Sequence, residues 1–181
     1  MSILIAFILI ITGGLLIWWI PAFKYCALSR KLWLLAWIVK LASMFSLYLL
    51  FTQYYTERSK ADIFRFYDDG VILNEVVKEN PKEFIKLMIG PIDKDPLFLE
   101  YLEKTTNLDQ KQQSILKGSN DFIVKVHALF SFIPYSNYHS NAIIFNFIGF
   151  IGLLFIYAFV LHFIPEKKYI LFVCMLILPS F

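Results

Sequence analysis

The feature that most constrains this chain is a set of long apolar runs with almost no charged residue. The first run, Ile3–Ile20, has no charge in eighteen residues, and the second, Leu32–Thr52, has only Lys40. A third run covers Asn141–Ile164. Because a bilayer-spanning helix needs about 20 mostly apolar residues, we expect three full transmembrane helices in an all-α, polytopic membrane protein.

The charged residues lie mostly between the second and third runs. Of the 31 Lys, Arg, Asp and Glu residues, 24 fall between Glu57 and Lys125. This distribution predicts two transmembrane helices within 1–52, a polar loop at 53–139, and a third helix with the start of a fourth at 140–181. The loop has 11 basic and 13 acidic residues and no basic patch, so the expected partner is the lipid bilayer and not a nucleic acid.

Two short connections carry the positive charge that orients a membrane protein. The connection at 21–31 has three basic residues and no acid, and the turn at 165–168 adds two lysines. Short basic connections remain in the cytoplasm, whereas long loops cross the membrane regardless of their charge. We therefore expect the N-terminus and residues 53–139 on the extracytoplasmic side.

A fourth apolar run begins at Tyr169 and is still apolar at Phe181. At 1.5 Å per residue, its thirteen residues reach roughly 20 Å, which is less than a hydrocarbon core of about 30 Å. We therefore expect a truncated fourth helix, in the N-terminal part of a longer protein. The alternative is a re-entrant last helix.

The polar loop has the residue spacing of amphipathic helices. Ser59 and Asp62 match a capping box, and apolar residues at intervals of three and four predict a helix that ends near Lys78. Asn80-Pro81 then ends this helix and begins a second one, with asparagine as the N-cap and proline in the first turn.

Two further helices are expected in the second half of the loop. A candidate helix covers 95–104. Gly118 marks a break, after which Ser119 or Asn120 caps a helix with a broad apolar stripe over 121–133. This last helix is too short to cross a bilayer, so we expect it to lie in the outer headgroup region or to pack against the other helices.

Two acids and an arginine share one face of the first loop helix. Asp62, Arg65 and Asp69 are three and four positions apart, just beyond the second transmembrane helix. A carboxylate there can deprotonate an acceptor hydroxyl or bind a divalent metal ion, the one candidate cofactor. The structural alternative is that Asp62 caps the helix and pairs with Arg65, while Asp68 and Asp69 form a solvated face. The three histidines are not spaced as metal ligands.

Lys40 is the second candidate functional position. An ionisable residue within a transmembrane helix is costly to bury and often marks a functional site. Alternatively, its long stem carries the ammonium toward the cytoplasmic surface. In the third run, Asn146 is expected to hydrogen-bond across helices, and Gly149 and Gly152 are expected to permit close helix packing.

The order of these features resembles a known class of enzymes. The segment Asp62-Ile-Phe-Arg65-Phe66 matches the pattern D-x-x-R-[FY] that begins the first outer loop of GT-C superfamily glycosyltransferases, such as the protein mannosyltransferases and the aminoarabinose transferases of lipid A. The stretch 122–157 resembles the second half of that loop and the helix that follows. The segment YYTERSKADIFRFYDDGVIL, at 54–73, and the final LPSF resemble multi-spanning proteins of Bacteroidetes-type bacteria.

The resemblance implies an enzyme of the bacterial inner membrane with a periplasmic loop. It would transfer a sugar from a polyprenyl-phosphate carrier to a lipid or glycan acceptor. Asp62 would be the catalytic acid of the loop, and Arg65, Asp69 and Lys40 would bind substrate. Two other functions remain open: a non-enzymatic structural or assembly subunit of a cell-envelope complex, and a polysaccharide polymerase or ligase.

Overall fold

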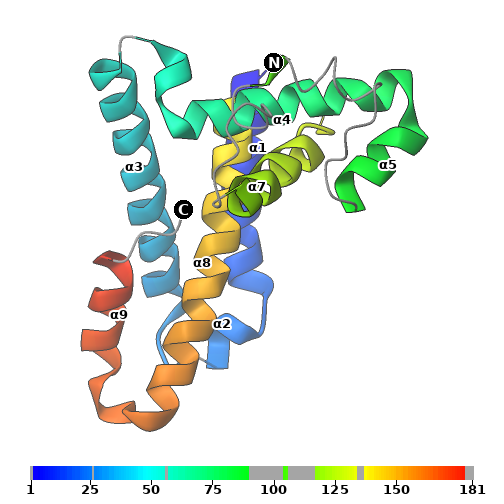
Figure 1. Cartoon of the computed structure of the whole chain (residues 1–181). Helices are drawn as coiled ribbons and strands as arrows, with labels where there is room; N and C mark the ends of the chain where they lie inside the picture. The colour runs from blue at the N-terminus through cyan, green and yellow to red at the C-terminus, as the bar shows by residue number, and fades with distance from the viewer. Residues whose placement is uncertain are drawn as a thin grey trace. The chain divides into compact units, whose positions relative to one another are not determined.

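The computed structural model describes residues 2–25, 27–55, 57–89, 104–105, 117–133 and 137–177 (Figure 1). Every regular element in these ranges is a helix, which confirms the all-α prediction. The chain forms two compact units. The long-helix unit consists of Met1–Leu50 and Ala142–Phe181, and the loop unit consists of Phe51–Asn141.

The long-helix unit is built from five helices, two of which continue for a few residues into the loop unit. These helices are α1 (Ser2–Trp19), α2 (Ala22–Tyr25), α3 (Arg30–Tyr54), α8 (Tyr138–Phe163) and α9 (Lys168–Ile177), with the short 3-10 turn η2 (Pro165–Lys167) before α9. The second and third apolar runs thus became α3 and α8.

Among the described residues, two helices, α3 and α8, are long and apolar enough to cross a membrane, with 25 and 26 residues and mean hydropathies of 1.9 and 2.5. Helix α1 has 18 residues and α9 has ten, so both are shorter. The structure therefore supports two of the expected spans by length and composition. The segment at 178–181, where the fourth run ends, lies outside the described residues.

The surfaces of these two helices are mostly uncovered. Only 28% of the most apolar window of α3 and 33% of that of α8 is buried, whereas the core helix of a soluble protein would be mostly buried. Ile38 on α3 and Phe155 and Phe159 on α8 are among the large apolar side chains that are more than half exposed. Exposed apolar surface on this scale is typical of a membrane-facing helix.

An aromatic cluster around Trp33 forms the centre of the long-helix unit. The indole of Trp33 is fully buried, and its ring makes edge-to-face contacts at centroid distances of 5.2–6.2 Å with Phe23, Phe150, Tyr157 and Phe172. These rings come from α2, α8 and α9. A single side chain of α3 therefore joins three other helices of the unit.

Helix α1 packs closely on α3 at Gly13. A Cβ added to Gly13 would lie 2.9 Å from the Trp37 ring, and the Trp37 Nε1 donates a hydrogen bond of 3.4 Å to the Ile10 carbonyl. In contrast, a Cβ added to Gly152 on α8 would have no neighbour within 4 Å. The expected close packing at Gly152 is thus wrong, and the structure places such a contact at Gly13.

The loop unit contains a 3-10 turn and three described helices. These are η1 (Arg58–Lys60), α4 (Asp62–Glu79), α5 (Pro81–Ile89) and α7 (Lys117–Phe130). The predicted break at Asn80-Pro81 is confirmed, because α4 ends at Glu79 and the Asn80 side chain accepts a hydrogen bond from the Glu83 amide at 3.4 Å. An asparagine cap followed by proline stops one helix and begins the next.

Two predicted helix starts in the loop are wrong. Helix α4 has Ala61 as its N-cap, without a side-chain hydrogen bond, so Asp62 is the first helical residue and the cap is not at the predicted Ser59. Helix α7 begins at Lys117 and includes Gly118, because glycine near a helix end is tolerated at a modest cost. The candidate helix at 95–104 lies outside the described residues, except for Lys104.

Helices α4 and α7 cross at Gly70. A Cβ at this position would lie 2.5 Å from the His127 Cβ and 3.0 Å from both the Ala128 nitrogen and the Val124 oxygen. The absence of a side chain therefore lets the two backbones meet. The apolar side chains beside the crossing form the core of the loop unit, which consists of Leu73, Val76, Phe84, Val124 and Ala128.

Candidate functional site

Asp62 is an exposed carboxylate at the start of the loop unit. It is the first residue of α4 and follows α3, which ends at Tyr54, by eight positions. Its Oδ1 lies 3.2 Å from the Arg65 Nη1, and the two side chains are 69% and 25% exposed. The pair at positions i and i+3 confirms the ion-pair alternative, and it leaves most of the Asp62 carboxylate open to solvent.

Arg65 has a further hydrogen-bond donor, its Nε. Its Nε is buried and has no hydrogen-bond acceptor among the described residues. A guanidinium with one nitrogen on a carboxylate can also bind a second anionic or carbonyl oxygen when another of its N–H groups is accessible. Asp62 and Arg65 are thus the two predicted site residues that the structure brings into contact.

Asp69 lies in a different environment from Asp62. It is 1% exposed, on the part of α4 that packs against other side chains, next to Gly70 at the crossing with α7. The solvated face proposed as an alternative for Asp69 is therefore wrong. A buried acid needs partners in the protein, and its carboxylate does not share the open surface of Asp62.

Arg58 and Asp68 form a second polar pair that the sequence did not suggest. The Arg58 Nε and Nη2 both donate to the Asp68 carboxylate at 2.9 Å. The same guanidinium lies 4.4 Å from the Phe64 ring centroid. This two-bond geometry fixes the turn η1 onto α4, and it places a second arginine and a second acid on the open surface of the loop unit, with side chains 50% and 43% exposed.

Four ring side chains connect α4, α7 and the first turn of α8. Tyr138 makes edge contacts with Phe64 at 4.9 Å and with Tyr67 at 5.8 Å, and Tyr67 makes one with His127 at 6.0 Å. Burial and the neighbouring Asp68 raise the pKa of the Tyr67 phenol, although Arg58 opposes this.

His127 is a neutral core residue of the loop unit. It is 7% exposed, and burial lowers its pKa from 6.5 to about 4. Its carbonyl accepts hydrogen bonds from the Ser131 hydroxyl at 2.9 Å and the Asn141 amide at 3.5 Å. His127 therefore contributes to packing as an uncharged ring near neutral pH. No group of three His, Cys, Asp or Glu side chains among the residues that the structure describes could hold a metal ion.

Lys40 belongs to the long-helix unit. It is 2% exposed, on α3, and is therefore buried. On α8, Asn146 is also fully buried. Buried polar side chains in helices of this apolarity are costly and require partners within the protein.

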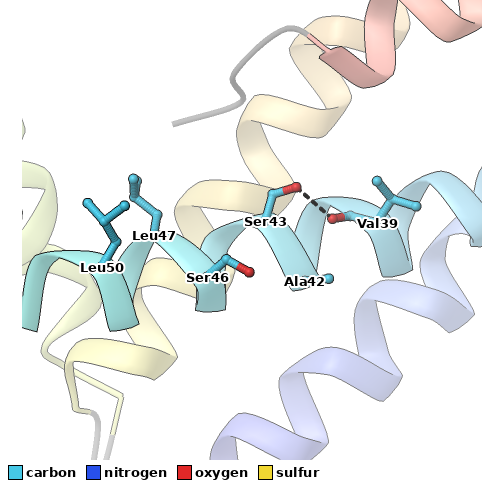
Figure 2. Close-up of a pocket in the computed structure, with 6 residues that line it drawn as sticks. All are labelled: Val39, Ala42, Ser43, Ser46, Leu47 and Leu50. Atoms are coloured by element: carbon cyan, nitrogen blue, oxygen red, sulfur yellow. Dashed lines mark hydrogen bonds between the residues drawn. The ribbon is translucent and has the colours of Figure 1, made fainter. Parts of the chain in front are cut away.

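A shallow, open groove runs along the side of α3 that carries Val39, Ser43 and Ser46 (Figure 2). It has a volume of about 570 Å³, and its lining residues recur at helical spacing along that one helix: Val39, Ala42, Ser43, Ser46, Leu47 and Leu50. The Ser43 hydroxyl donates to the Val39 carbonyl at 2.9 Å, so its one donor hydrogen is used within the helix. The groove is mainly apolar, and its chemistry suits a hydrocarbon chain better than a sugar.

The residues missed by sequence reasoning share one property: their partners are distant in the chain. Arg58 and Asp68 are ten positions apart, and Tyr67 and His127 are sixty apart. A helical pattern reports neighbours at three or four positions only. The one local indication of these contacts was the aromatic and charged composition of 54–73, the segment that resembles multi-spanning bacterial proteins.

No protein-family model, curated protein or solved structure matches this chain.

Proposed function

We propose that this chain is part of an integral membrane glycosyltransferase that transfers a sugar from a polyprenyl-phosphate carrier to a lipid or glycan acceptor. Helices α3 and α8 would cross a bacterial inner membrane, with α1 and α9 as additional membrane helices. The N-terminus and the loop unit would then be extracytoplasmic, as the basic connections at 21–31 and 165–168 indicate.

The observation that carries the proposal is the position of Asp62. An exposed carboxylate begins the first helix after a membrane-length helix, and Arg65 holds one of its oxygens at 3.2 Å. Glycosyl transfer to a hydroxyl requires a base to take the proton of the acceptor, and a carboxylate in hydrogen-bond reach of that acceptor can do so. The loss of this group lowers such rates by typically 10²–10⁴-fold.

Arg65 would bind an anionic group of the donor. A polyprenyl-phosphate sugar carries a phosphate, and arginine recognises phosphate through paired N–H donors. The Nε of Arg65 has no acceptor among the described residues, which supports this role, but it is buried and would have to be uncovered to reach a phosphate. The apolar groove on α3 is compatible with a lipid-linked substrate. Lys40 and Asp69, both buried, would act only through a rearrangement that exposes them.

The test is Asp62→Asn in the natural protein, reconstituted in lipid vesicles with a panel of polyprenyl-phosphate sugars. An extract of bacterial membrane lipids and glycans supplies the acceptor hydroxyl, and the readout is the release of polyprenyl phosphate, so the acceptor need not be identified. We expect release to fall at least about 100-fold, whereas the loss of a charge at a helix N-terminus costs only about 0.3–1 kcal/mol of stability.

The matched control is Glu75→Gln, which neutralises another exposed acid of α4. It should release polyprenyl phosphate at the normal rate. Equal rates in the Asp62→Asn and unmodified proteins would remove Asp62 from the site. If the unmodified protein releases nothing from any donor of the panel, the non-enzymatic role in a cell-envelope complex becomes the better hypothesis.

A further inference from the structure

Helix α7 is apolar on two opposite faces. One face packs against α4 through Val124 and Ala128, both fully buried. On the other face, Phe122 is 70% exposed and Leu129 is 47% exposed. They are seven residues apart, which is two helical turns, so they lie on one line along the helix, opposite the buried side.

The composition of this helix does not suit an aqueous surface. Between Phe122 and Phe130 the one charged residue is Lys125, because His127 is buried and neutral near pH 7. A helix that is apolar all round is normally surrounded by apolar material. Packing against α4 provides apolar surroundings for the Val124–Ala128 face of α7, but not for the Phe122–Leu129 face.

The neighbours of α7 indicate the environment of its Phe122–Leu129 face. The His127 carbonyl accepts a hydrogen bond from Asn141, in the first turn of α8, and Tyr138 in the same turn contacts Phe64 of α4. The Asn137 side chain caps this turn through the Ser140 amide at 2.9 Å. Helix α7 therefore lies beside the point where a membrane-length helix begins.

We propose that the Phe122–Leu129 face of α7 lies in the headgroup region of the bilayer, as a lipid-contact surface of the loop unit. Its partner is the membrane that α8 enters, and the apolar side chains reach about 5–10 Å into the boundary between headgroups and acyl chains. The inference rests on the membrane insertion of α8 in the proposed function, but it is independent of glycosyl transfer.

The test uses single nitroxide labels in the complete protein, reconstituted in lipid vesicles, with the native cysteines replaced by alanine. Labels at Phe122→Cys and Leu129→Cys are compared with one at Glu75→Cys, an exposed polar position on α4. Accessibility is measured to oxygen, which concentrates in lipid, and to a water-soluble nickel chelate. These positions are exposed, so the labels do not disturb the core.

We expect the oxygen-to-nickel accessibility ratio at Phe122 and Leu129 to be several-fold higher than at Glu75. A ratio at both positions equal to that at Glu75 overturns the proposal, as does protection from both reagents, which would mean that protein covers the face. A label at Phe155→Cys on α8, which is 64% exposed, tests the membrane insertion of α8 separately from the lipid contact of α7. If Phe155 contacts lipid and α7 does not, the lipid-contact surface is wrong while membrane insertion stands; if Phe155 is aqueous, both are wrong.

Discussion

Gly70 on α4 and His127 on α7 lie so close that a Cβ on the glycine would be 2.5 Å from the Cβ of the histidine. We therefore expect Gly70→Ala to destabilise the loop unit. The extra methyl group forces the helices apart, at a typical cost of 1–3 kcal/mol, and the better helix propensity of alanine returns at most about 1 kcal/mol. Amide hydrogen exchange of α4 should become faster.

The control for this experiment is Gly152→Ala on α8, where an added Cβ meets nothing within 4 Å. Here only the helix-propensity gain remains, so exchange in α8 should be unchanged or slower. If α4 exchanged at the normal rate in the Gly70→Ala protein, the two helices would not be in contact at this position in solution.

Acidification should weaken the loop unit through His127. The histidine of an unfolded chain titrates near pH 6.5, whereas burial lowers the pKa in the folded protein to about 4. Between these values the unfolded state binds a proton that the folded state does not, so stability falls as the pH decreases from 6.5 toward 4. The loss is at most about 3 kcal/mol, from 1.36 kcal/mol for each pKa unit.

Two variants isolate the contribution of His127 to the pH dependence of loop-unit stability. His127→Met keeps an apolar side chain in the core and should flatten the dependence of loop-unit hydrogen exchange on pH between 4 and 6.5. His162→Gln changes an exposed histidine of α8 and should leave that dependence as it is. A pH dependence that survives in His127→Met would assign the titration to another group.

The Arg58–Asp68 pair should contribute a small, salt-sensitive coupling energy. Both side chains are about half exposed, and exposed pairs are worth about 0.2–1 kcal/mol in double-mutant cycles. The two parallel bonds at 2.9 Å favour the upper part of that range. A cycle with Arg58→Ala and Asp68→Ala, followed by chemical denaturation at low and high salt, measures it.

The Arg58→Lys variant separates the contribution of the two-bond geometry to the coupling energy from that of the positive charge. Lysine keeps the positive charge but cannot form the two-bond contact or stack its planar group on Phe64, so most of the coupling should disappear. The more exposed pair of Lys60 and Glu57, which has one contact at 2.9 Å, should give no more than about 0.5 kcal/mol in the same cycle. Equal coupling with lysine and arginine at position 58 would contradict the bidentate geometry.

Trp33→Ala should destabilise the long-helix unit more than a change at any exposed tryptophan. The four rings around Trp33 would lose their common contact. Replacement of a buried Trp by Ala typically costs about 3–5 kcal/mol, and we expect the lower end because lipid is itself apolar. Thermal unfolding in detergent, followed by circular dichroism, should show a lower midpoint, whereas Trp19→Ala, at a 77% exposed position, should not.

The sequence predicted those parts of the fold that depend on local chain composition. The apolar runs located α3 and α8 to within three residues at each end, and Asn80-Pro81 located the boundary between α4 and α5. Such signals act through solvent preference and backbone geometry, which neighbouring residues determine.

What the sequence could not provide depends on contacts between distant segments. Gly70 lies within the predicted first loop helix, but the contact that requires a glycine there is made by α7, more than fifty residues later. Asp69 shares a helical face with Asp62 by spacing, yet α4 packs asymmetrically and buries one acid while exposing the other. The two carboxylates have the same local pattern and different environments, and a helical repeat alone cannot distinguish them.

The tryptophans have a consequence for spectroscopy. All four lie within the first 37 residues, two of them buried in the Trp33–Trp37 region of α3 and two exposed near the end of α1. The loop unit has tyrosines and phenylalanines but no tryptophan. Emission excited at the red edge of indole absorption therefore reports on the long-helix unit alone. If acid opens the loop unit through protonation of His127, the tryptophan emission maximum should stay unchanged.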